Sequence, residues 1–275
     1  SLSSDTYGSK STALGYYALE NQNFTTATDT YNTAVGFNAG AATTTAVNNT
    51  LIGATAGDAL TTGGQNSVVG TFALGADDLG SYNTALGYNT LAVLNYATAT
   101  DGWNTAVGGR AGQAMTTAID NTLIGGEAGD ALTVGNSNVA VGAHALSADT
   151  KGDRNTAIGR ASLQVQNFTT TTDSYNTAVG YGTGEAITTG IYNTLIGGVA
   201  GDALVDADDN TAVGQWALSS DTYGSHSTAL GYYALEAQNF TTATDAYNTA
   251  IGSGAGKVVS TGIQNTLIGG LAGDA

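Results

Sequence analysis

The sequence contains no cysteine and no proline, and only six of its 275 residues are lysine or arginine, against 22 aspartate and glutamate residues. Without cysteine there are no disulfides, and nothing indicates a structural zinc site. A formal net charge of -16 leaves no basic surface to neutralise phosphates, which argues against nucleic acid as a partner. No apolar run approaches the roughly 18 residues of a membrane span, so we expect no direct insertion into a membrane.

The most abundant feature is a five-residue unit, usually Asn-Thr-Ala-(Val/Ile/Leu)-Gly, that occurs 15 times. Its final glycines are spaced by 21, 17, 17 and 17 residues in a cycle, so four units form a 72-residue super-repeat. This regularity argues against a disordered low-complexity chain and indicates a solenoid. We expect a single continuous solenoid over residues 1–275, a fragment of a longer chain, with blocks at about 11–82, 83–154, 155–226 and 227–275, the last one partial.

Each position of the unit has a physical interpretation. The first is Asn in 13 of 15 units, which suits a corner where side-chain amides stack in a ladder, and the fifth is always Gly, where the backbone turns or packs closely. The residues between them favour a strand, because no caps, heptads or helical stripes accompany the repeat. The sequence therefore predicts an all-β fold, a parallel β-solenoid (β-roll) of about 15 coils with 17 or 21 residues each. At a coil spacing of about 4.8 Å, it would be a rod of roughly 70 Å.

The apolar residues of the unit predict both a core and an interface. In the third coil of each block the usual Ala becomes Leu, at Leu51, Leu123, Leu195 and Leu267, and we expect it to fill volume left by glycines of neighbouring coils. Positions three and four are both apolar yet point to opposite faces of a strand. One face can fill the coil, and the other then needs a partner, so we predict self-association as a homo-oligomer, preferably a homotrimer, or as a filament.

Units such as residues 32–36 and 104–108, both Asn-Thr-Ala-Val-Gly, resemble the head repeats of trimeric autotransporter adhesins. They are also similar to the 17-residue arrays of phage tail fibres and of environmental surface proteins. The resemblance covers the whole chain. It implies a left-handed, trimeric, extracellular β-roll on a cell surface or virion that is used for attachment.

The 21-residue coils carry a recurring set of aromatic and acidic residues that suits carbohydrate stacking and hydrogen bonding. The alternative is a bulged loop whose aromatic residue caps the core and whose Asp closes a turn. Repetition along the solenoid would suit weak, multivalent binding to cell-surface glycan. The candidate residues are Phe24, Asp29, Tyr31, Tyr96, Asp101, Trp103, Phe168, Asp173, Tyr175, Phe240, Asp245 and Tyr247.

No cofactor is predicted, although calcium is one interpretation of the best acidic cluster, formed by Asp202, Asp206, Asp208 and Asp209. The alternative for the recurring aspartates is turn chemistry, in which Asp accepts from backbone N–H groups. This alternative covers the Asp-x-x-Gly segments that end at Gly8, Gly80, Gly152 and Gly224, and the Ala-Gly-Asp-Ala segments at Asp58, Asp130, Asp202 and Asp274.

The sequence indicates a structural or adhesive protein and not an enzyme. His144 and His226 occupy different positions of the repeat and have no recurring nucleophile or carboxylate, and the acids recur regularly instead of converging on a groove. We expect a segment of an extracellular fibre or surface filament. The alternatives are a phage tail-fibre shaft that binds a host receptor, or an ice- or mineral-binding solenoid. The last is disfavoured if the threonines at position two turn inward together with the aliphatic residues at position four.

Overall fold

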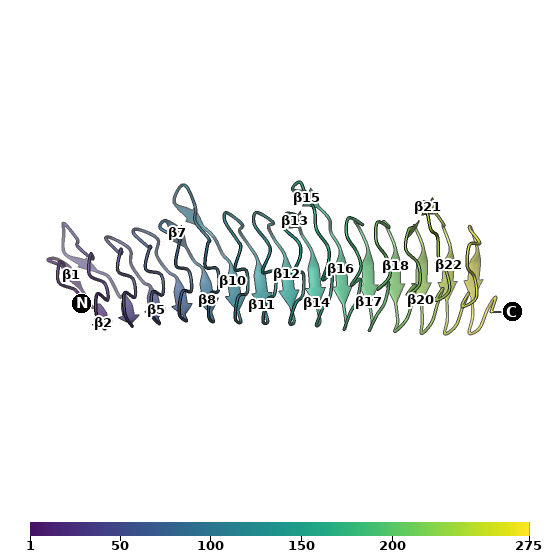
Figure 1. The fold of residues 1–275 in the computed structure, drawn as a ribbon, viewed down its shortest axis with the longest axis horizontal. Helices are drawn as coiled ribbons and strands as arrows, with labels where there is room; N and C mark the ends of the chain where they lie inside the picture. Colours follow the sequence, from purple (N-terminus) through teal and green to yellow (C-terminus); the bar gives the residue numbers. More distant parts are fainter. Residues whose placement is uncertain (275) are drawn as a thin grey trace. The chain divides into compact units, whose positions relative to one another are not determined.

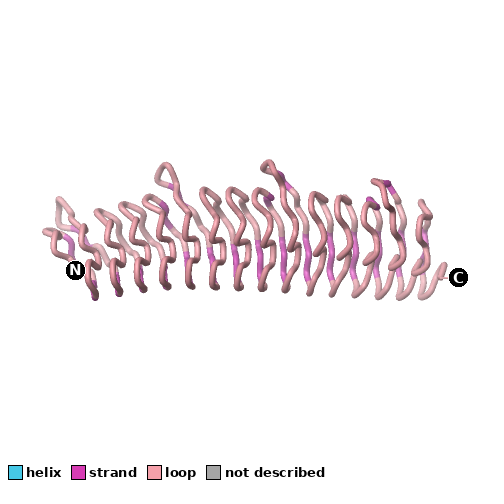
Figure 2. Tube along the Cα trace, viewed as in Figure 1, coloured by secondary structure: helices cyan, strands magenta, loops and turns pink. Residues whose placement is uncertain are grey.

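The computed structural model describes residues 1–274 and leaves residue 275, the last of the predicted segment, outside the described part. The described chain consists of short strands joined by turns and loops and contains no helix, so none that could cross a membrane (Figure 2). The prediction of an all-β parallel solenoid of about 15 turns is confirmed. The chain forms two compact units, residues 1–137 and the residues from Asn138 onward.

Each unit contains one parallel sheet built from the three-residue strands of the repeat unit (Figure 1). In the first unit the order is β2 (Thr12–Leu14), β4 (Thr33–Val35), β5 (Thr50–Ile52), β6 (Ser67–Val69), β8 (Thr84–Leu86), β10 (Thr105–Val107) and β11 (Thr122–Ile124). In the second unit it is β12 (Val139–Val141), β14 (Thr156–Ile158), β16 (Thr177–Val179), β17 (Thr194–Ile196), β18 (Thr211–Val213), β20 (Thr228–Leu230), β22 (Thr249–Ile251) and β23 (Thr266–Ile268).

The four 21-residue coils, residues 11–31, 83–103, 155–175 and 227–247, each end in a two-residue strand that pairs with the coil before. We call them the first to fourth long coils. In the second unit, the long coils at β15 and β21 reach beyond the short coils beside them (Figure 1). The pairs are β1 (Gly8–Ser9) with β3 (Thr28–Asp29), β7 (Gly80–Ser81) with β9 (Thr100–Asp101), β13 (Gly152–Asp153) with β15 (Thr172–Asp173), and β19 (Gly224–Ser225) with β21 (Thr244–Asp245).

The pairing register places each position of the five-residue repeat beside the same position of the repeat in the next coil. Between β4 and β5, for example, Ala34 lies opposite Leu51 and Val35 opposite Ile52. The third position is buried in almost every coil, whereas the second and fourth are partly or largely exposed. The expectation that the position-two threonines turn inward is therefore wrong. Alternation along a strand places positions two and four on the outer face, because the third residue, usually Ala and in every fourth coil Leu, fills the interior.

The asparagines at position one form the expected corner ladder inside the coils. Asn32 Oδ1 accepts from the backbone N–H of Asn49 at 2.9 Å, and Asn49 Oδ1 accepts in the same way from Asn66. The Asn49 amide donates to the carbonyl oxygen of Gly63 at 2.9 Å. These side chains are fully buried, so the ladder satisfies polar groups that would otherwise be costly inside the protein.

Glycine is required at the end of each strand. Gly53 has a φ of +134°, and a Cβ there would lie 2.6 Å from the carbonyl oxygen of Gly70 in the next coil. Neighbouring coils thus approach each other backbone to backbone at this turn, which excludes any side chain.

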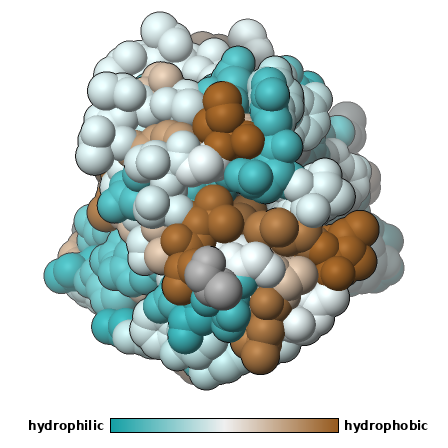
Figure 3. Space-filling model, turned by 90° about the vertical axis from the view of Figure 1, so that its right-hand side faces the viewer, coloured by the Kyte–Doolittle hydropathy of each residue, from teal (hydrophilic) through white to brown (hydrophobic). Residues whose placement is uncertain are grey.

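The exchange of volume between leucine and glycine is also confirmed. Leu51 is fully buried, and its Cδ1 lies 2.6 Å from where a Cβ of Gly40 would be, while its Cδ2 lies 2.8 Å from that of Gly57. Figure 3 looks at the end of the last described coil and shows the apolar interior that stacked coils otherwise cover. The core is thus a thin column of small and large apolar side chains matched between successive coils.

Candidate functional site

The predicted aromatic residues of the long coils divide into a buried set and an exposed set. The buried set caps the interior, as the bulged-loop alternative predicts, and comprises Phe24, Tyr96, Phe168 and Phe240. The exposed set consists of the last residue of each long coil, Tyr31, Trp103, Tyr175 and Tyr247, each about half exposed. Only the exposed set is available to a ligand.

The exposed aromatic residues share one backbone conformation. Each immediately precedes the position-one residue of the next unit, and each has a positive φ between +49° and +51°. Lys10, Tyr82, Arg154 and His226, which immediately precede the long coils, share this conformation, with φ between +60° and +63°. Because the coils are parallel and in register, the residue before a long coil and the aromatic residue at its end are neighbours in one row.

In the first long coil this neighbour is a lysine that bridges an acid and a ring. Lys10 Nζ lies 2.6 Å from Asp29 Oδ2, 3.0 Å from the Tyr31 hydroxyl and 5.0 Å from the centre of the Tyr31 ring. The hydrogen bond from Lys10 holds the pKa of Asp29 below its usual value, and the bond to Asp29 raises the pKa of Lys10. The Asp29 side chain therefore binds a cation and does not close a turn, which corrects that part of the bulged-loop alternative.

The third long coil repeats the arrangement with an arginine. Arg154 forms an ion pair with Asp173, and its guanidinium carbon lies 5.4 Å from the centre of the Tyr175 ring. Tyr175 also stacks on Tyr192 of the following coil, with ring centres 5.8 Å apart. Cation, carboxylate and ring again form one contact set.

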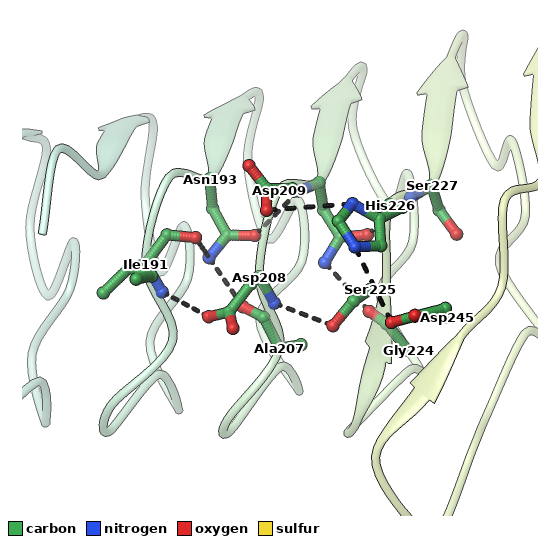
Figure 4. A network of polar contacts seen from close by, with 11 residues as sticks. Ile191, Asn193, Ala207, Asp208, Asp209, Gly224, Ser225, His226, Ser227 and Asp245 are labelled. Carbon is green, nitrogen blue, oxygen red and sulfur yellow. Dashed lines mark hydrogen bonds and ion pairs between the residues drawn. The ribbon is translucent and has the colours of Figure 1, made fainter.

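In the fourth long coil the neighbour is a histidine held between two carboxylates (Figure 4). His226 Nδ1 lies 3.7 Å from Asp209 and Nε2 lies 3.6 Å from Asp245. Its ring lies parallel to Tyr247 at 4.9 Å between centres. The adjacent Ser227 is fully buried and accepts a hydrogen bond from Gln238, so its side chain points into the coil and away from the partly exposed histidine.

The second long coil differs, because the neighbour is an aromatic residue. Tyr82 stacks on Trp103 with ring centres 4.1 Å apart and planes 16° apart. Asp101, the counterpart of Asp29 and Asp173, is exposed and forms no ion pair with any residue in 1–274. The carboxylate and the ring are present here without a cation.

The four predicted calcium ligands do not gather into one site. Asp206 accepts from the Thr189 hydroxyl at 2.7 Å, Asp208 accepts from the backbone N–H of Ile191 at 2.8 Å, and Asp209 faces His226. Burial raises the pKa of Asp202 to about 6. In the described part of the chain no three acidic, histidine or cysteine side chains are placed to hold a metal ion, and residues 1–274 enclose no pocket.

The Asp-x-x-Gly segments are turns of the predicted kind. Asp149 Oδ1 accepts from the backbone N–H of Gly152 at 2.9 Å, and Asp221 Oδ1 accepts from Gly224 at 3.1 Å. The same bond forms in the first unit, from Gly8 to Asp5 and from Gly80 to Asp77.

The pairing of a basic side chain with three of the four long coils was missed in the sequence, although a signal was present. Residues 10, 82, 154 and 226 are spaced by 72, so Lys, Tyr, Arg and His occupy one position of the super-repeat. The fold defines the class of this protein as a parallel β-solenoid. No family model, curated protein or solved structure matches the chain.

Proposed function

We propose that this chain is a structural segment of an extracellular fibre or surface filament, not an enzyme, and that it associates with further copies of itself through the outer face of its sheet. The resemblance to adhesin heads and tail-fibre arrays supports a homotrimer on a cell surface or virion. A tail-fibre shaft is the alternative within the same architecture.

The observation that carries this proposal is a row of uncovered aliphatic side chains. The position-four residues stand side by side on the outer face, and we call them the outer row. Seven of them are 37–39% exposed: Ile52, Val69, Leu86 and Ile124 in the first unit, and Ile158, Ile196 and Ile251 in the second. In-register parallel strands keep the row continuous within each unit.

Exposure of this aliphatic row to water is energetically unfavourable. Burying apolar area yields about 25 cal/mol per Å², and long apolar patches on soluble proteins usually mark interaction sites. The flanking position-two threonines are partly exposed and uncharged, so a second apolar face can approach without desolvating charges. A copy of the same chain offers a matching repeat, which favours self-association over an unrelated partner.

Sedimentation of the purified chain tests the proposal. We expect a mass of three chains of 27.3 kDa for the wild type, and the single-chain mass for Val69→Glu/Leu86→Glu, which adds two charges to the outer row. Tyr88→Glu/Val93→Glu adds the same charge at exposed apolar residues outside the row and should remain associated. A monomeric wild type, or equal dissociation of both variants, would contradict the proposal.

Attachment by this segment would use the exposed aromatic residues of the long coils, which recur every 72 residues and suit weak, multivalent contact with a glycan. A glycan array read with the wild type and with Tyr31, Trp103, Tyr175 and Tyr247 all changed to alanine tests this role. Binding that survives all four changes would contradict it.

A second candidate function is favoured by the corrected orientation of the threonines. Position-two Thr and position-four Val, Ile or Leu form parallel rows on one face, which is the arrangement that an ice- or mineral-binding surface needs. Thermal hysteresis of the wild-type chain that is lost in Thr84→Lys/Thr105→Lys would support this candidate. If a monomeric form of the chain shows no thermal hysteresis, the candidate is ruled out.

A further inference from the structure

Four equivalent positions in the super-repeat show what the surface of a long coil binds. In the first, third and fourth long coils, a basic side chain of the chain itself contacts both the aspartate and the exposed ring. The three side chains are chemically different: an ammonium at Lys10, a guanidinium at Arg154 and an imidazole at His226. What these coils share is a nitrogen base that contacts both the carboxylate and the ring, and in the first and third coils that base is a permanent cation.

The second long coil offers the same partners without the cation. Asp101 occupies the position of Asp29 and Asp173, in register with Ser81 across the β7–β9 pair. Trp103 occupies the position of Tyr31 and Tyr175 and is 55% exposed. Tyr82 stands where the cation would be and stacks on Trp103, which enlarges the aromatic surface beside the free carboxylate.

A second carboxylate adjoins this surface. Asp120 precedes the next coil, is exposed, and has the positive φ of +60° shared by the row. It is therefore the next member of the row after Trp103. The counterparts of Asp120 after the other long coils are the uncharged Asn48, Tyr192 and Gln264. Of the four long coils, only the second is followed by an acid at this position of the row.

We propose that Tyr82, Asp101, Trp103 and Asp120 form a binding site for a basic side chain, lysine or arginine, of a partner protein. The partner's cation would lie against the exposed part of the stacked Tyr82–Trp103 pair, beside the carboxylate of Asp101. A single exposed cation–π contact with an ion pair gives only weak binding. This site goes beyond the proposed structural function and does not depend on it.

Trp103 is one of two tryptophans, so a Trp216→Phe background makes its indole resonance a specific reporter. Titration with N-acetyl-arginine amide should shift this resonance, while the uncharged N-acetyl-citrulline amide, which has nearly the same shape, should not. Tyr82→Arg places the chain's own cation in the site, as Arg154 does in the third long coil, and should weaken binding at least tenfold. Asp101→Asn should weaken it about two- to fivefold.

Asp173→Asn is the matched control, because it removes the same charge from a long coil that Arg154 already occupies. It should leave the titration at Trp103 unchanged, which separates the site from general attraction to an acidic protein. Equal shifts with the citrulline compound, undiminished binding to Tyr82→Arg, or equal weakening by Asp101→Asn and Asp173→Asn would each overturn the proposal. None of these variants touches the outer row, so the oligomeric mass tests the structural function separately.

Discussion

The second and third long coils have the same length and backbone, but different side chains make the hydrogen bonds to their buried turn and corner asparagines. In the third, Gln166 donates to Asp149 Oδ2 at 2.6 Å and accepts from Asn176 Nδ2 at 2.8 Å, so one amide joins the turn to the corner ladder. In the second, Leu94 stands at that position. The Tyr96 hydroxyl accepts from Asn104 instead, and the same hydroxyl donates to the carbonyl oxygen of Ala118 at 2.8 Å.

The exchange satisfies Asn104 but leaves both the turn and the corner amide of Asn83 incomplete. Asp77 Oδ2 and Asn83 Nδ2 are buried without a hydrogen-bond partner, and burial raises the pKa of Asp77 to about 6. The pKa of Asp149 is also raised by burial, but there the bond from Gln166 opposes the shift. The comparison teaches that the repeat tolerates a change of core chemistry in one coil even when a buried turn oxygen and one corner amide are left without partners.

The largest effect should come from Gln166→Leu, which gives the third long coil the leucine that the second has at the equivalent position, Leu94. The buried Asp149 carboxylate would lose its closest donor and Asn176 an acceptor, with no tyrosine hydroxyl to compensate. We expect a loss of about 2–4 kcal/mol in the free energy of unfolding at pH 7, measured by urea denaturation. Leucine already fits this backbone in the second coil, so a loss under about 0.5 kcal/mol would mean that the amide bridge contributes little.

Asp77→Asn should remove a pH dependence that the buried carboxylate creates. The folded-state pKa of about 6 exceeds the usual 3.8, so the folded protein binds this proton more tightly than the unfolded chain. The contribution of Asp77 to stability is therefore complete below pH 4 and is lost as pH rises to about 6. At pH 7 we expect the variant to be more stable by about 2 kcal/mol, and urea unfolding between pH 4 and 7 measures the difference. Parallel pH profiles of the two proteins would contradict this.

Leu94→Gln/Tyr96→Phe gives the second long coil the chemistry of the third. A donor would then reach Asp77 Oδ2, so its pKa should fall toward the usual value, and stability at pH 7 should rise by about 1 kcal/mol. Carboxyl chemical shifts of Asp77, followed through a pH titration, measure the pKa. Leu94→Gln alone is the control, because it keeps Tyr96 on Asn104 and crowds the same space.

The smallest effect should come from Arg154→Ala at the surface of the third coil. Its ion pair with Asp173 and its contact with the Tyr175 ring are exposed, so water and salt screen them. We expect a change of under about 0.5 kcal/mol in the same urea assay. A loss of several kcal/mol would show that the cation holds the long coil in place.

The sequence by itself determined the solenoid, because a strict period needs no tertiary information to be recognised. The coil lengths, the asparagine corner, the obligatory glycine at residues such as Gly53 and the complementarity of Leu51 with Gly40 and Gly57 all followed from residues repeated at fixed spacing. Each of these features is a contact between a coil and its immediate neighbour, so position in the repeat already specifies the partner.

Only the tertiary structure decided which face of each strand is outside. Alternation separates Thr33 and Val35 from Ala34 but is the same for either choice, and the width of the closed coil selects the small residue for the interior. The structure also decided which side chains meet between neighbouring coils. Lys10 pairs with Asp29 and His226 with Asp245, each about 20 residues apart in the sequence. One oxygen of Asp77, by contrast, is buried without a partner. Composition fixes which of these groups exist, and the stacking of coils fixes which of them touch.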